Sequence, residues 1–235
     1  MSHFVFPKWT NALVATLGLL ALSAPLYAVG LVWFGFSPKT LVVGYQPEQP
    51  VAFFSHRTHA GDLGMDCRYC HNTVERAAKA AIPPTQTCMN CHHAIFNVPD
   101  ATVTVQEGAP PIVQRRTIQP IINSYYTGEP ILWRRVHDLP DYAFFDHSAH
   151  VTRGVSCVEC HGRVEQMDKV EIVSELSMKW CLDCHRKSDI HLREPRDVFN
   201  LGLDLGDEDA RMQLGASLRT RNQINPSTDC STCHR

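Results

Sequence analysis

The sequence predicts a protein that is mostly coil with short α-helices, preceded by one N-terminal transmembrane helix. Three observations lead to this prediction. The motif Cys-x-x-Cys-His occurs five times in 235 residues. A block Phe-x-His-x-x-His occurs twice, at Phe54–His59 and at Phe145–His150. No charged residue lies between Trp9 and Pro38.

The five motifs use all ten cysteines of the chain, which leaves no thiol for a disulfide or a nucleophile. Two thiols at this spacing can form thioethers to one porphyrin, and the adjoining His can ligate its iron. The sequence therefore predicts five covalently bound haems c, with the short helices and coil arranged around a five-haem cluster. The attaching residues would be Cys67, Cys70, Cys88, Cys91, Cys157, Cys160, Cys181, Cys184, Cys230 and Cys233. The proximal iron ligands would be His71, His92, His161, His185 and His234.

Paired cysteines also occur in zinc knuckles and in disulfide frameworks. Zinc sites pair two Cys-x-x-Cys units but do not require a His directly after each second Cys. Here that His is present in all five copies. The pattern therefore favours haem over zinc or disulfides.

The motifs and blocks together indicate an internal duplication. Each Phe-x-His-x-x-His block precedes one motif, at Cys67 or Cys157, and a second motif follows at Cys88 or Cys181. Each half thus carries two motifs and two upstream histidines, and the fifth motif lies near the C-terminus. So little polypeptide surrounds five haems that the porphyrins must provide much of the buried apolar surface.

The uncharged N-terminal run is longer than the about 20 residues that cross a bilayer. The alternative is a cleaved signal peptide, whose apolar region is usually about 7–15 residues, with Ser23-Ala24 as a possible cleavage site. We expect an uncleaved single-pass anchor in the cytoplasmic (inner) membrane, kinked at Pro25. Because thioether attachment takes place outside that membrane, the haem domain is expected on the periplasmic side.

The chain is predicted to divide into seven segments: a cytoplasmic tail (1–10), the anchor helix (11–36), an extended linker (37–50), a first dihaem module (51–93), a connecting segment (94–135), a second dihaem module (136–186) and a C-terminal segment with the fifth haem (187–235). Short helices are expected at Glu75–Ala81 and Asp207–Leu218, and a strand at Val98–Val105. The apolar residues Ile118–Ile122 and Tyr125-Tyr126 would either wrap the haem domain or dock a partner subunit.

The formal net charge is −2, and no basic run exceeds two residues. A nucleic-acid surface needs clustered Lys and Arg. The composition therefore gives no indication of nucleic-acid binding.

The two blocks resemble those of multihaem cytochromes of the c7 and c3 type. The resemblance implies that the first His of a block ligates the nearest haem and the second ligates another haem of the module. His56 would then serve the haem of His71, and His59 that of His92. In the same way His147 would serve the haem of His161, and His150 that of His185.

The fifth haem has no second ligand from a block. His137 is the first candidate to pair with His234. His93, directly after the second motif, is next, because c3-type proteins use such an adjacent His for a neighbouring haem. His191 and Met178 are weaker candidates, and a Met ligand would raise the potential.

Three further segments, Pro130–Pro140, Met178–Arg186 and Asp229–Arg235, resemble the pentahaem c-type cytochrome subunit (ActA) of alternative complex III. That resemblance implies an electron-transfer subunit of a quinol-oxidising membrane complex, which is not an enzyme on its own. An iron–sulfur subunit, quinol-binding membrane subunits and a monohaem cytochrome c subunit would be its partners. Electrons would pass to a periplasmic carrier or a terminal oxidase.

Two alternatives remain from the sequence. A membrane-anchored quinol dehydrogenase of the NapC or NrfH type also has one helix and several haems, but such proteins place the first haem near the membrane and lack the duplicated block. A multihaem reductase would need one open, high-spin haem, and the fifth haem keeps that alternative open.

Overall fold

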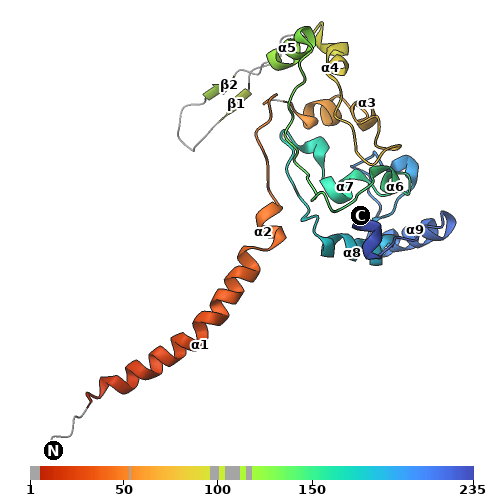
Figure 1. Cartoon of the computed structure of the whole chain (residues 1–235). Coiled ribbons are helices and arrows are strands. Elements are labelled where there is room, and N and C mark those ends of the chain that lie inside the picture. Colours follow the sequence, from red (N-terminus) through yellow and green to blue (C-terminus); the bar gives the residue numbers. More distant parts are fainter. Residues whose placement is uncertain (1–5, 53, 96–100, 104–111, 115–117) are drawn as a thin grey trace, which may run out of the picture. The chain divides into compact units, whose positions relative to one another are not determined.

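The computed structural model describes residues 6–52, 54–95, 101–103, 112–114 and 118–235. The chain divides into two compact units at Val43, a boundary that falls within the segment predicted as a linker. Figure 1 follows the chain from the long helix α1 through a series of short helices joined by coil.

The first unit holds α1 (Trp9–Gly35) and α2 (Pro38–Val42). None of the 27 residues of α1 is buried, and the helix is long and apolar enough to cross a membrane, a criterion that a signal sequence also meets. The helix continues through Pro25. The expected extended linker instead begins with α2, because Ser37 accepts a hydrogen bond from the backbone N–H of Thr40 and caps a short helical turn.

The second unit is mostly coil that joins short elements, which confirms the predicted fold class. Its α-helices are α3 (Cys67–Cys70), α4 (Thr85–His92), α5 (Gln119–Thr127), α6 (His147–Val151), α7 (Cys157–His161), α8 (Met178–Arg186), α9 (Glu208–Arg221) and α10 (Cys230–Cys233). Within the described residues, the π-helix η1 (Arg57–Asp62) and the 3₁₀ helices η2 (Val164–Gln166), η3 (Ser188–His191) and η4 (Pro195–Asp197) lie between them. Strands β1 (Ala101–Val103) and β2 (Ile112–Gln114) pair antiparallel.

Most of the buried apolar side chains of the described residues form three small clusters. They are Val51, Met89, Ile118 and Ile121; Val74, Val151 and Val198; and Leu192, Leu218 and Ile224. A domain of this size normally has one contiguous core. Small separate clusters are what we expect where porphyrins complete the interior.

The segment Glu75–Ala81 is a series of turns rather than the predicted helix. Its carbonyls bond to distant groups instead of the N–H four residues ahead. The carbonyl of Ala81 accepts from the ring of His71, and that of Ala78 accepts from the ring of His147. Helix propensity therefore yields to the hydrogen bonds of two histidines, which sequence reading did not anticipate.

The helix expected at Asp207–Leu218 is confirmed as α9, which ends three residues later at Arg221. The Asp207 side chain accepts a hydrogen bond from the N–H of Ala210 at 2.9 Å, which satisfies a free donor of the first turn. Of the strand expected at Val98–Val105, the structure describes Ala101–Val103, which is β1. The rest of that strand lies outside the described residues.

The apolar part of the connecting segment is helix α5, which packs on α4. Ile118 and Ile121 are buried against Val51 and Met89, so these residues pack on the helix that carries the second motif. Tyr126 on the same helix is 78% exposed. A docking role for this exposed side remains a prediction.

Gly215 lets α9 pack against η3. A Cβ at this position would lie 1.7 Å from the carbonyl oxygen of Asp189. We predict that Gly215→Ala lowers stability by about 1–3 kcal/mol through overpacking, despite the higher helix propensity of Ala. Urea unfolding checks this, with the exposed Ser217→Ala on the same helix as the control. An unchanged midpoint for Gly215→Ala would contradict the close approach.

Candidate haem sites

Each Cys-x-x-Cys-His motif lies on, or at the end of, a short helix. Residues three apart share one helix face, so both sulfurs of a motif lie on the same side and the His follows directly. In the first and the fifth motif, the N–H of His71 donates to Cys67 O at 2.8 Å and that of His234 donates to Cys230 O at 2.9 Å. All ten cysteines are free of disulfides. This arrangement fits two thioether bonds to one porphyrin.

The two Phe-x-His-x-x-His blocks have the same geometry. Phe54 lies edge-on to His56 at 4.9 Å and stacks on His59 at 4.9 Å. Phe145 lies edge-on to its first histidine at 4.8 Å and stacks on its second at 4.6 Å. The duplication that the sequence predicts is thus reproduced in three dimensions, and each Phe fixes the directions of two imidazoles.

The structure brings each block histidine to the motif histidine that the resemblance assigned to it. An iron held at about 2 Å from each of two imidazole nitrogens separates the ring centroids by about 6 Å. The separations are 6.5 Å for His56 and His71, 6.3 Å for His59 and His92, 6.3 Å for His147 and His161, and 6.1 Å for His150 and His185. All four spaces fit an iron between two rings.

Hydrogen bonds at Nδ1 fix the tautomer of most of these rings. A histidine that donates through Nδ1 leaves Nε2 free to ligate a metal. The carbonyls within reach of Nδ1 are Ser55 for His59, Ala81 for His71, Ile95 for His92, Ala78 for His147, Asp146 for His150, Ser227 for His185 and Tyr142 for His234, at 2.5–3.2 Å. The donor set therefore fits haem iron.

Burial keeps the central imidazoles in the neutral form that ligates metals. Desolvation, followed by repulsion from neighbouring histidines, lowers the pKa of His56 to about 4 and that of His161 to about 3. Desolvation also lowers the pKa of His150. These rings are uncharged at neutral pH.

Each Phe-x-His-x-x-His block also forms hydrogen bonds to the segment that carries the other block's motifs. The His147 ring bonds to Ala78 O at 2.8 Å, in the turn that follows the first motif. The guanidinium of Arg57 donates to Gln166 O at 2.9 and 3.1 Å, in the loop after the third motif. The Ser55 hydroxyl donates to Asp168 in the same loop at 2.8 Å. The segment that carries the first two motifs is therefore tied by hydrogen bonds to the segment that carries the third, which the sequence pattern does not reveal.

The structure places His137 against His161 rather than against His234. The centroids of His137 and His161 are 4.2 Å apart, and His137 Nε2 lies 3.3 Å from His161 Nδ1. The aromatic ring that contacts His234 is Tyr142, at 5.9 Å. The assignment of His137 to the fifth haem stays a prediction, and no contact between these residues supports it.

The weaker candidates for that ligand differ in what they contact. His93 is exposed and bonds through Nδ1 to Met89 O at 2.9 Å, which leaves Nε2 free. The His191 ring lies 2.6 Å from the carboxylate of Glu159. Met178 is 67% exposed at the start of α8. None of them contacts His234 among the described interactions.

A charged cluster that sequence reading missed surrounds Glu159, inside the third motif. Arg193 and Arg211 lie 3.6 and 3.7 Å from its carboxylate. Within the described part of the chain, the Nε atoms of both arginines are buried without a hydrogen-bond partner. Such donors fit a haem propionate, because arginine binds carboxylates strongly.

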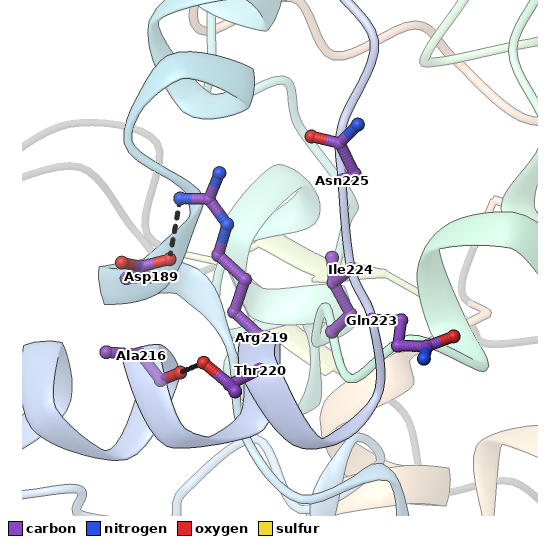
Figure 2. Close-up of a pocket in the computed structure, with 7 residues that line it drawn as sticks. All are labelled: Asp189, Ala216, Arg219, Thr220, Gln223, Ile224 and Asn225. Carbon is purple, nitrogen blue, oxygen red and sulfur yellow. Dashed lines mark hydrogen bonds and ion pairs between the residues drawn. The ribbon is translucent and has the colours of Figure 1, made fainter.

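The recess between α9 and η3 is lined by residues that belong to none of these candidate haem sites (Figure 2). Its volume is about 560 Å³, and Asp189 and Arg219 in its wall form an ion pair at 3.4 Å. No motif cysteine and no histidine lines it. We assign it no role in haem binding.

Five attachment motifs and the paired imidazoles define a multihaem c-type cytochrome that carries five haems c. Residues 143–235 match the family of cytochrome c7 and related cytochromes c. The chain is also 33% identical over 145 residues to the menaquinone reductase multiheme cytochrome c subunit of Nitratidesulfovibrio vulgaris (strain Hildenborough). That match covers 59% of this chain and 59% of the relative.

The second ligands can be tested one haem at a time. Replacing His59 by Ala removes the ring opposite His92, and we predict that one low-spin iron becomes high-spin. Magnetic circular dichroism of the oxidised protein measures this change. Thr58→Ala, which alters the residue next to His59 in η1 and removes no imidazole, serves as the matched control. Unchanged spin states in His59→Ala would show that the pairing is wrong.

Proposed function

We propose that this chain is the electron-relay subunit of a membrane quinone oxidoreductase complex. The observation that carries the proposal is the set of four histidine pairs with centroids 6.1–6.5 Å apart. An iron with a His on each side has no position for a substrate. Such haems exchange electrons, and their ligands, burial and hydrogen bonds set their potentials.

Contacts between the motifs support a single relay path. The Asn90 side chain of the second motif bonds to Tyr69 of the first at 2.9 Å. In the fourth motif, His185 bonds at 2.5 Å to the carbonyl of Ser227, just before the fifth.

The attachment thiols follow the same order. For four thiols, the largest influence after burial that raises the pKa is a thiol of another motif: Cys88 for Cys70, Cys67 for Cys157, Cys184 for Cys160, and Cys233 for Cys181. We infer a path through the second, first, third, fourth and fifth haems in that order, or the reverse.

The kind of complex is inferred from similar proteins, which differ in the direction of electron flow. The chain spans 59% of the length of the relative it matches. The name of that relative indicates quinone reduction, whereas the resemblance to the alternative complex III subunit implies quinol oxidation. In either direction, we propose that iron–sulfur and quinone-binding membrane subunits exchange electrons with this chain, and that a monohaem cytochrome accompanies it in the quinol-oxidising case.

The long helix α1 supports a membrane anchor in this proposal. If it is retained, the chain purified from membranes has an intact mass that includes residues 9–35 and five haem additions. Mass spectrometry of the chain, with and without protease treatment of sealed spheroplasts, measures both retention and sidedness. Loss of the N-terminal residues would instead identify a cleaved signal peptide.

The proposed function is tested by comparing the whole complex with the isolated chain. We predict that the complex exchanges electrons between a menaquinone analogue and the haems, and that the isolated chain does not. Stopped-flow absorbance at the haem α-band measures both. Quinol oxidation by the isolated chain would favour the NapC or NrfH type, and a high-spin haem that binds nitrite would favour a reductase.

A further inference from the structure

His137 contacts a proposed iron ligand on the side away from the iron. Its Nε2 lies 3.3 Å from Nδ1 of His161, and the two rings meet edge to face at 79°. The other face of the His161 site is occupied by His147, whose ring is nearly parallel to that of His161 at 6.3 Å. His161 therefore has two imidazole neighbours, His147 and His137.

The direction of the hydrogen bond follows from ligation. If Nε2 of His161 binds iron, its proton lies on Nδ1, and Nδ1 is then the donor. His137 must accept through Nε2 and carry its own proton on Nδ1. An Nε2 that accepts this hydrogen bond is not free to ligate the haem of His234.

This partner sets His161 apart from the other proximal histidines. His71, His92, His185 and His234 each have a backbone carbonyl at Nδ1. His161 has an imidazole nitrogen, which is a stronger base than an amide carbonyl. A stronger acceptor draws the Nδ1 proton away and raises the basicity of the ligating nitrogen.

We propose that His137 is a positioning residue that orients His161 and lowers the potential of its haem. A more basic ligand favours the ferric over the ferrous iron, so the equilibrium of this haem shifts toward the oxidised state. The segment that carries His137 continues into the block that carries His147, only ten residues later. One stretch of chain thus controls both sides of the third haem. The inference rests on His161 being a haem ligand, as proposed above.

The test replaces His137 by Phe, which keeps a ring but has no acceptor. Potentiometric titration of the holoprotein, followed by electron paramagnetic resonance, gives the potential and the spin state of each haem. We expect one of the five potentials to rise by an amount equal to about a tenfold change in the reduction equilibrium, about 59 mV for one electron. The number of low-spin irons should not change.

Two further variants complete the test. His137→Gln offers an amide oxygen as a weaker acceptor and should restore part of the shift. Leu132→Ala, which alters an exposed, uncharged side chain in the same segment as His137, is the control and should leave all five potentials unchanged. Haem content by mass spectrometry shows whether each variant is intact.

Two outcomes overturn the inference. Conversion of one iron to high spin in His137→Phe would make His137 an axial ligand, as the sequence first predicted for the fifth haem. Five unchanged potentials in both His137 variants would leave His137 without influence on the iron. Neither outcome bears on quinone exchange by the whole complex, so failure of the proposed function is recognised separately.

Discussion

The structure of the second unit depends on the distance between paired imidazoles. Four pairs of rings, drawn from segments up to 35 residues apart in the sequence, meet at 6.1–6.5 Å. No continuous apolar core among the described residues explains this agreement, because the clusters there are small. The common element is an iron-sized space between rings whose Nδ1 atoms are mostly held by carbonyls. Short helices and coil are sufficient when ligation and thioether bonds fix the chain.

The sequence predicted the parts of this arrangement that repeat. The number of haems followed from motif spacing, and the mostly coiled fold followed from how little chain surrounds them. Helix α9 was predictable because its signals are local: Asp207 caps it, acidic residues begin it and arginines end it. The resemblance of the two blocks to those of c7- and c3-type cytochromes implied the four histidine pairs that the structure brings together.

The features that the sequence did not predict depend on contacts between distant residues. Glu75–Ala81 has helix-forming residues, yet its carbonyls bond to His71 and His147. Arg193 and Arg211 are far from Glu159 in the sequence but lie beside its carboxylate in the structure. No motif spacing indicates such a cluster. His137 was the first candidate for the fifth haem, and no pattern in the sequence indicates that it lies beside His161.

The angles between paired rings give the most direct test of the account. The planes of His56 and His71 differ by 3° and those of His147 and His161 by 9°, whereas His59 and His92 differ by 57° and His150 and His185 by 37°. Electron paramagnetic resonance of low-spin ferric haem is sensitive to this angle. The account predicts two haems with the rhombic signals of near-parallel ligand planes and two with the larger maximum g values of tilted planes. A single class of signal, or high-spin signals from these four irons, would contradict it.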